Sequence, residues 1–65
     1  MPRLELLKFR KSQRLTQKEM ADKLGISVMH YSRIETGNSN PSYELLERAK
    51  VIFQVEDIFK LFEKC

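Results

Sequence analysis

The chain contains one cysteine, one histidine and two glycines, and this scarcity excludes several kinds of site. The cysteine, Cys65, is the last residue, so no disulfide can form within the chain, which fits a reducing compartment. We interpret a bridge between two chains through Cys65 as an artefact of air oxidation. A structural zinc ion needs more ligands than His30 and Cys65 supply, so we predict no metal site. Two glycines are also too few for a glycine-rich phosphate loop.

Long apolar segments are missing as well. No apolar run approaches the roughly 20 residues of a membrane-spanning helix. Charged residues such as Arg3, Glu5 and Lys8 interrupt the leucines near the N-terminus, so we expect no signal peptide and a cytoplasmic location. The acidic pair Glu56-Asp57 is typical of a helix start rather than of acid–base chemistry. We therefore predict that the chain is not an enzyme, and that it has no cofactor, no small-molecule ligand and no membrane contact.

The size and charge of the chain favour a single small domain with a basic end. Sixty-five residues, 42% of them apolar, suit one compact, helical domain. Residues 1–40 hold eight Lys/Arg against four Asp/Glu, whereas residues 41–65 hold four against five. Such an uneven basic charge suits a polyanionic partner, although a solvated surface with ordinary scatter would give the same count.

The segment 16–37 predicts two short helices joined by a tight turn. Thr16 and Glu19 have the spacing of a capping box at the start of the first helix. Gly25 stands where a left-handed residue ends that helix, and Gly37 ends the unit in the same way. The apolar face of the first helix consists of Met20, Ala21 and Leu24.

The second helix of this unit has an unusual outer face. Ser27 can cap it, and Tyr31 and Ile34 pack inward together with Ile26. At 100° per residue, the opposite face consists of Val28, Met29, Ser32 and Arg33. Two apolar residues, a hydroxyl and a cation suit a surface that reads DNA, through thymine methyl groups and through guanine or phosphate. A half-buried Val28 or Met29 is the alternative, and the helical phase argues against it.

A first helix is predicted over residues 2–13. Leu6 and Phe9 begin its apolar stripe, and Arg10 and Gln13 continue it. An arginine on the core side of a helix needs a partner.

Two more helices follow a polar loop. Ser42 can cap a helix over residues 43–53, and the last helix is expected over residues 55–64. The apolar residues of the first are Leu45, Leu46, Ala49, Ile52 and Phe53, and those of the last are Val55, Ile58, Phe59, Leu61 and Phe62. The last helix carries more apolar surface than it can easily bury, so part of it closes the core, through Ile58 and either Leu61 or Phe62. Leu4 and Leu7 either pack on this helix or form an exposed patch for a partner.

These residues resemble the helix-turn-helix of the phage repressor and Cro family, also called the XRE family. The matching motifs are Leu15-Thr16-Gln17, Ala21, Gly25, Ser32-Arg33-Ile34-Glu35-x-Gly37 and Asn40-Pro41-Ser42. The match extends from about residue 6 to residue 59. It implies an all-α, compact five-helix lambda-repressor-like domain over residues 1–65, with the helix-turn-helix at about 16–36. This plan and the initial methionine suggest a complete chain.

The resemblance also implies roles for individual residues. Residues at its major-groove positions are Ser27, Val28, Met29, Ser32 and Arg33. Candidates for phosphate contact are Arg14, Thr16, Gln17, Lys18, His30, Asn38, Ser39 and Asn40. Arg10 and Glu35 match positions that form a largely buried ion pair. One departure concerns residues 53–57, which lack the Gly or Asn and the polar cap of relatives, so the last two helices are joined by a tight bend or partly merge.

The leading interpretation is a sequence-specific regulator of transcription, most simply a small bacterial or phage repressor that binds a two-fold symmetric operator. We expect double-stranded DNA as partner and a weak homodimer, with Val55, Phe59 and Phe62 as dimer contacts. The alternative is a protein-interaction module on the same scaffold, antitoxin-like or associated with a polymerase. The basic N-terminal part favours the first interpretation, and the apolar C-terminus favours the second.

Overall fold

The computed structural model describes residues 2–63, and within this range the chain forms five α-helices and no strand. The helices are α1 (Leu4–Ser12), α2 (Gln17–Leu24), α3 (Val28–Thr36), α4 (Tyr43–Phe53) and α5 (Ile58–Leu61). The predicted all-α, five-helix class is confirmed. The prediction of a last helix over residues 55–64 was wrong: α5 has Asp57 as its N-cap and Phe62 as its C-cap, so it is much shorter. Cys65 lies outside the described residues. None of the helices in the described range has the length and apolarity needed to cross a membrane.

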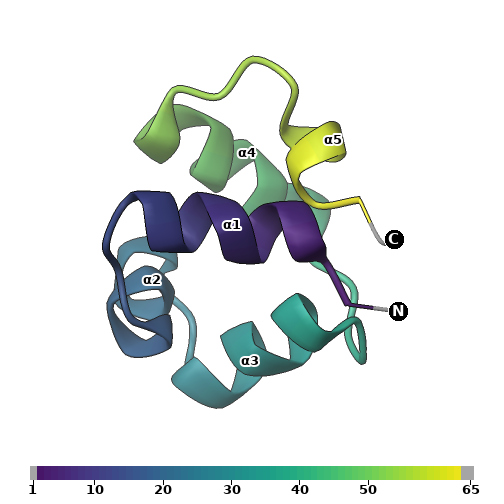
Figure 1. Cartoon of the computed structure of the whole chain (residues 1–65). Helices are drawn as coiled ribbons and strands as arrows, with labels where there is room; N and C mark the ends of the chain where they lie inside the picture. The colour runs from purple at the N-terminus through teal and green to yellow at the C-terminus, as the bar shows by residue number, and fades with distance from the viewer. Residues whose placement is uncertain (1, 64–65) are drawn as a thin grey trace.

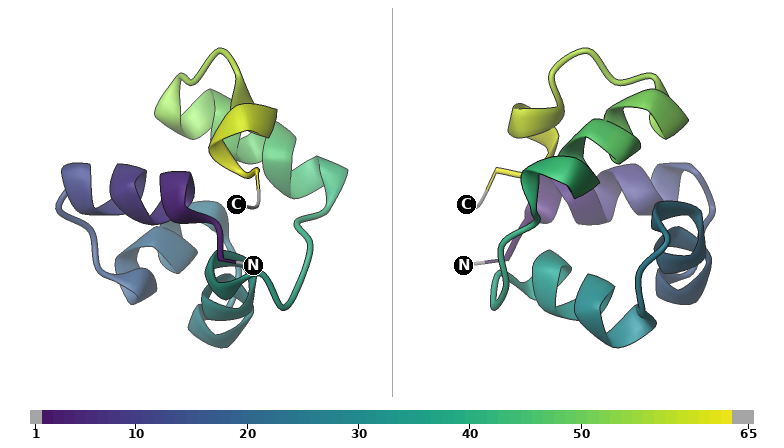
Figure 2. Two further views of the ribbon diagram at one scale, coloured as in Figure 1. Left: turned by 45° about the vertical axis from the view of Figure 1, so that its right-hand side comes forward. Right: turned by 180° about the vertical axis from the view of Figure 1, so that it is seen from behind.

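The helix α1 crosses the middle of the molecule, with α2 and α3 on one side and α4 and α5 on the other (Figure 1). In this arrangement α3 contacts both α1 and α2, and α5 contacts both α1 and α4. The first and last described segments lie near each other, as all three views show (Figure 2). Residues from the two ends of the chain can therefore contact each other on one side of the domain.

The turn between α2 and α3 forms as its residues predict. Thr16 and Glu19 make both hydrogen bonds of the capping box: Glu19 N donates to Thr16 Oγ1 at 3.1 Å, and Thr16 N donates to Glu19 Oε1 at 2.9 Å. Ser27 Oγ accepts from His30 N and caps α3. Gly25 has a φ of 73°, and a Cβ placed on it would lie 3.0 Å from Arg48 Nη1. The positive φ favours glycine there, and a larger residue would also have to displace the end of the Arg48 side chain.

The core joins all five helices. Every residue predicted to face inward from α2 and α3 is buried, and Leu6 of α1 is completely so. The buried apolar residues are Leu6, Met20, Ala21, Leu24, Tyr31, Ile34, Leu45, Leu46, Ala49, Ile58 and Phe62. Leu15 and Ile26 are half-buried and pack against this cluster, as does Phe9, whose ring meets that of Phe53 edge-on at 5.2 Å.

Three further predictions about helix limits and burial were wrong. The helix α1 begins at Leu4, and Gln13 is its exposed C-cap rather than part of the apolar stripe, because the chain turns away at Arg14 with a φ of 58°. Ile52 is 39% exposed. The reason is the shortness of α5, which has four residues and leaves the end of α4 uncovered (Figure 1).

The connection between α4 and α5 also differs from the expectation of a bend without caps. Gln54 adopts the left-handed conformation usual for glycine, with a φ of 54°. Asp57 Oδ1 accepts from Lys60 N at 3.0 Å and is the polar cap of α5. The two helices do not merge. Gln54 ends α4 in place of a glycine or asparagine, and Asp57 is the polar cap that begins α5.

We expect Gln54→Gly to stabilise the domain, because glycine adopts a positive φ without steric cost. The free energy of unfolding should rise by about 0.5–1 kcal/mol in chemical denaturation. The matched control is Gln13→Gly, because Gln13 caps α1 at a φ of −86° and gains nothing from glycine. A decrease in stability in both variants would contradict strain at Gln54.

Candidate nucleic-acid interface

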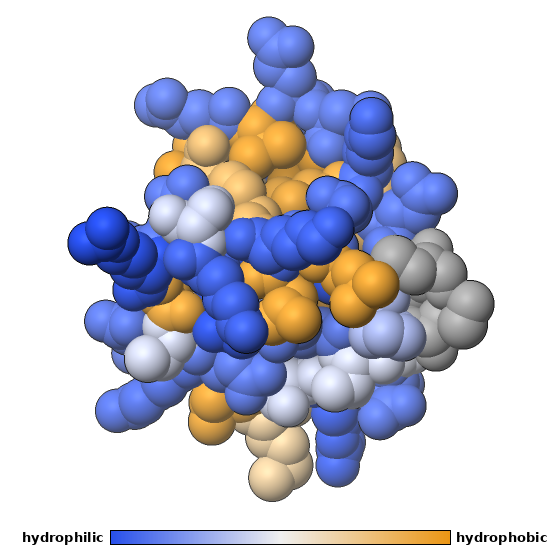
Figure 3. All heavy atoms as spheres, viewed as in Figure 1, coloured by the Kyte–Doolittle hydropathy of each residue, from blue (hydrophilic) through white to orange (hydrophobic). Residues whose placement is uncertain are grey.

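The outward face of α3 consists mostly of exposed residues. Met29 is 64% exposed, and Val28 and Arg33 are exposed as well. Ser32 is half-buried beside them, and Ser27 lies exposed at the helix start. Neither Val28 nor Met29 is among the residues that pack against the core, which argues against the predicted alternative of a half-buried Val28 or Met29. In Figure 3, apolar and hydrophilic side chains project side by side over α3, at the lower edge of the view.

A buried carboxylate holds α3 against the two preceding helices. Glu35 is 6% exposed, and it forms the expected pair with Arg10, whose Nε donates to Glu35 Oε2 at 2.8 Å. Arg10 Nη2 and Gln17 Nε2 both donate to Glu35 Oε1, at 3.2 and 3.0 Å. Tyr31 Oη donates to Glu35 Oε2 at 2.6 Å. One carboxylate thus joins α1, α2 and α3, and we call these four residues the Glu35 cluster.

The Glu35 cluster is charged at neutral pH. Burial alone would raise the pKa of the Glu35 carboxyl, but the hydrogen bonds from Arg10, Tyr31 and Gln17 lower that pKa below its ordinary value of 4.5. The same hydrogen bond to Glu35 raises the pKa of Arg10. Burial, and then the neighbouring carboxylate, raise the pKa of the Tyr31 hydroxyl, so Tyr31 stays protonated and donates.

The predicted phosphate contacts lie just before α2 and at its start, within α3, and in the loop beyond α3. Gln17 is half-buried at the first position of α2, and its amide is oriented by Glu35. An amide nitrogen carries two N–H groups, so Gln17 keeps one for a ligand. Arg14, Thr16 and Lys18 are exposed around it. Of the remaining candidates, Ser39 is half-buried, and the exposed ones are His30, Asn38 and Asn40.

Arg3 is an important residue that sequence reasoning missed. It is 3% exposed, and its guanidinium donates to Phe62 O at 2.8 Å, to Ser39 O at 2.9 Å, to Asn40 Oδ1 at 3.1 Å, and to Ile34 O. Its main-chain N donates to Glu35 O at 2.8 Å. Burial lowers the pKa of Arg3. No local pattern signals this role, because Arg3 precedes α1 and its acceptors are mostly main-chain carbonyls far along the chain.

Arg48 is a second missed cross-link. Its Nη1 donates to Leu24 O at 2.6 Å and so satisfies a carbonyl at the end of α2, close to Gly25. The polar side of α4 therefore supports the turn between α2 and α3.

The predicted dimer contacts separate into three environments. Phe62 does not belong to that surface: its side chain is 6% exposed and lies in the core, because the chain folds back after α5 toward Arg3. Val55 is half-buried against the core, and Phe59 is 64% exposed. The exposed apolar residues of this side are Leu4, Val51, Ile52 and Phe59. Apolar surface broken by hydrophilic side chains is visible over α1, α4 and α5 in the upper part of Figure 3.

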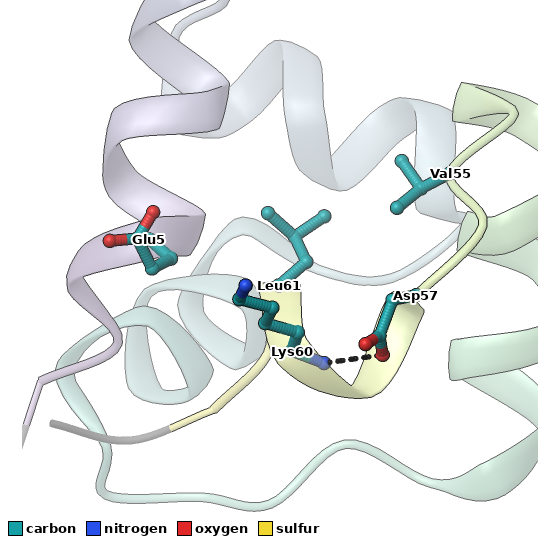
Figure 4. A pocket seen from close by; sticks show the side chains of 5 residues that line it. All are labelled: Glu5, Val55, Asp57, Lys60 and Leu61. Atoms are coloured by element: carbon teal, nitrogen blue, oxygen red, sulfur yellow. Dashed lines mark hydrogen bonds between the residues drawn. The ribbon is translucent and has the colours of Figure 1, made fainter.

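A small hollow between α1 and α5 carries no chemical constellation. It is lined by Glu5, Val55, Asp57, Lys60 and Leu61 (Figure 4). The Asp57 carboxylate already caps α5 there. Within residues 2–63 no cluster of three or more His, Cys, Asp or Glu side chains could hold a metal ion.

Comparison with known proteins identifies the arrangement of α2, turn and α3. A helix-turn-helix family profile matches residues 6–61. The chain belongs to the helix-turn-helix family. The predicted resemblance to the phage repressor and Cro type is thereby confirmed, and so is the prediction that this domain is not an enzyme.

One relative of the helix-turn-helix domain is the "Uncharacterized HTH-type transcriptional regulator YqaE" of Bacillus subtilis (strain 168). The two are 44% identical over 50 residues, which are 77% of this chain and 43% of YqaE. The chain thus spans less than half the length of that relative. No solved structure matches the chain.

Acid should weaken the helix-turn-helix domain through Glu35. The pKa of Glu35 is lower in the folded than in the unfolded state, so between the two values the unfolded state binds more protons. The free energy of unfolding should therefore fall as the pH drops from about 4.5 through the folded pKa. Glu35→Gln should be less stable near neutral pH and should show a flatter acid profile, measured by urea denaturation across the pH range.

Glu5→Gln is the matched control, because it removes the same charge from the exposed side of α1. It should keep the acid profile of the wild type. Identical acid profiles for Glu35→Gln and the wild type would contradict a low pKa at Glu35. Glu19 contributes to the pH dependence of stability that remains in Glu35→Gln, because its hydrogen bonds with Thr16 lower its pKa.

Proposed function

We propose that this domain binds double-stranded DNA as a regulator of transcription, with α3 in the major groove. The observation that carries the proposal is the difference among its arginines. Arg3, Arg10 and Arg48 are held by hydrogen bonds within the domain. Arg33 is exposed on the outward face of α3, and its guanidinium has no partner among residues 2–63. A cation kept free beside apolar residues is suited to an external ligand.

Sequence is read by the outward face of α3. Arg33 donates to guanine in the major groove, because a forked guanidinium matches the two acceptors of that base. Val28 and Met29 contact thymine methyl groups, since neither side chain can hydrogen-bond to a base. Ser27 and Ser32 flank them with hydroxyls. The base sequence of the operator therefore depends on this combination of side chains and does not carry over from a relative with other residues at these positions.

The phosphate contacts position this face on the duplex. The N-terminus of α2 directs free amides outward, and Gln17 lies there with its side chain set by Glu35. Arg14 and Lys18 add positive charge beside it. A second set of contacts comes from the loop after α3, residues 38–40. His30 is adjacent to the reading face and meets a phosphate at its edge.

The domain acts as a weak homodimer, and the simplest regulator of this kind is a small repressor. One reading helix covers few base pairs, and two related by symmetry read half-sites roughly 34 Å apart. Phe59 is at the centre of the dimer surface, with Val55 at its edge. Leu4 lies on the same side of the domain, so it extends the apolar area.

The same exposed apolar residues support a second candidate function, a protein-interaction module. Val51 is 75% exposed on α4, and it has no role in the proposed DNA contacts. On this alternative, α4 and α5 dock a larger protein, and the helix-turn-helix is a scaffold.

Selection of binding sites from random duplex DNA at near-physiological salt separates the two functions, because affinity depends steeply on salt. The proposal predicts an enriched motif with two-fold symmetry. Binding that enriches no motif and disappears as salt rises would mean that the basic face acts only by charge. Sequence-specific DNA binding would then be rejected.

Arg33→Ala should weaken binding to the selected site by about 1–3 kcal/mol and relax preference at one base position. Lys18→Ala is the matched control, because removal of a phosphate-binding side chain weakens all sequences equally and lowers the salt slope by about one. Both are measured by fluorescence anisotropy on the selected duplex and on its single-base variants. A uniform decrease in affinity on every duplex for Arg33→Ala would place Arg33 on a phosphate instead.

A further inference from the structure

The Arg3 guanidinium forms hydrogen bonds with three separate parts of the chain. Its acceptors are Phe62 O just after α5, Ile34 O in the last turn of α3, and two groups of the loop, Ser39 O and Asn40 Oδ1. At 3% exposure the side chain is almost completely removed from water. A buried cation with these partners is a built structural feature rather than a surface contact.

All the acceptors of Arg3 are neutral oxygens. A buried charge is expensive unless it is well hydrogen-bonded, and here carbonyls replace a carboxylate. The carbonyls at the C-terminal end of α3 have no partner within the helix and carry partial negative charge. The planar fork of arginine spreads five N–H donors over three nitrogens and makes all four of these hydrogen bonds, whereas lysine has three donors on one nitrogen.

The loop that Arg3 holds is short of other support. Asn38 N and Ser39 N both donate to Arg33 O, at 2.8 and 3.1 Å, and thereby fold the loop back on α3. Arg3 supplies the side-chain hydrogen bonds to Ser39 and Asn40, and these connect the loop to a residue outside α3. Among residues 2–63, no other side chain donates to Ser39 O or Asn40 Oδ1, so the loop depends on Arg3 for this connection.

We propose that Arg3 is a positioning residue for DNA binding: it fixes residues 38–40 in the conformation that meets phosphate and ties that loop to the end of α5. This inference rests on the proposed function, because the loop matters only if it lies on DNA. Arg3 itself faces inward and touches no DNA. Its effect passes through Ser39 and Asn40. It also links the α5 side of the domain, which carries the proposed dimer surface, to the reading side.

The test compares Arg3→Lys and Arg3→Gln with the wild type at a temperature well below each melting transition. Affinity for the selected duplex is measured over a series of salt concentrations. We expect Arg3→Lys to bind about tenfold more weakly with an almost unchanged salt slope, because Asn38, Ser39 and Asn40 carry no charge and release no counterions. Amide hydrogen exchange should become at least about tenfold faster at Asn38 and Ser39 and remain unchanged at Met20, which lies in the core.

Phe53→Ala is the matched control for a decrease in stability alone. It removes the edge-on contact with Phe9 at the far end of α4 and leaves Arg3 and its acceptors intact. It should lower the melting temperature without changing the affinity for the duplex or the exchange at Ser39. An equal decrease of affinity in Phe53→Ala, or unchanged affinity and exchange in Arg3→Lys, would overturn the inference.

The two proposals fail in different ways. If the wild type selects no DNA, the proposed function fails, and exchange at Asn38 and Ser39 still decides whether Arg3 orders the loop. If neither Arg3 variant folds, the inference is tested on the wild-type protein instead. The inference then requires a slowly exchanging Arg3 Nε–H proton in the nuclear magnetic resonance spectrum, whose signal shifts when the selected duplex binds. An Arg3 signal that DNA leaves unmoved would contradict it.

Discussion

The Glu35 carboxylate is the interaction on which the rest of this domain depends. A buried carboxylate is stable only when it is paired and its oxygens accept hydrogen bonds, and here three side chains from three helices supply them. Arg10 and Gln17 can reach Glu35 only if α1, α2 and α3 have one particular arrangement. The same arrangement turns Val28, Met29 and Arg33 outward. The orientation of the proposed reading face is therefore a consequence of satisfying one charge.

Arginine side chains serve as cross-links in a domain too small for a large core. Arg10 pairs with a carboxylate, whereas Arg3 and Arg48 bind main-chain carbonyls at or just beyond helix ends. Arg3 and Arg48 thereby satisfy carbonyls that short helices leave without partners. Two of the eight cations in residues 1–40 are thus structural rather than available to a ligand. The charge count alone therefore overstates the positive charge available on the surface. The exposed Arg33 on α3 is correspondingly the stronger candidate for contact with a ligand.

Local patterns predicted most of the fold. The capping box at Thr16, the left-handed Gly25 and the period of α4 each depend on residues close in sequence, and all are present. The fold after α4 was less predictable. Gln54 takes a conformation that its residue type disfavours, so propensity pointed away from it. Phe62 is apolar and near the end of the chain, and nothing local distinguishes a core position from an exposed one.

In the candidate site, too, features set by local sequence were predictable and those set by long-range contacts were not. Helical phase alone placed Val28, Met29 and Arg33 on one face, and the exposed fractions agree. The Arg10–Glu35 pair came from family resemblance, because a spacing of 25 residues carries no local signal. Arg3 had neither source, since its partners lie 31 to 59 residues away. Long-range contacts of polar side chains with main-chain carbonyls leave no pattern in a single sequence.

We propose that one face, formed by α3 with the start of α2 and the following loop, meets DNA. Nuclear magnetic resonance titration of the ¹⁵N-labelled domain with the selected duplex shows residue by residue whether this is so. We expect amide shift changes concentrated in residues 14–18, 27–33 and 38–40, with smaller changes on α5 from dimerisation. Changes centred on residues 51–59, or no change with any duplex, would contradict it.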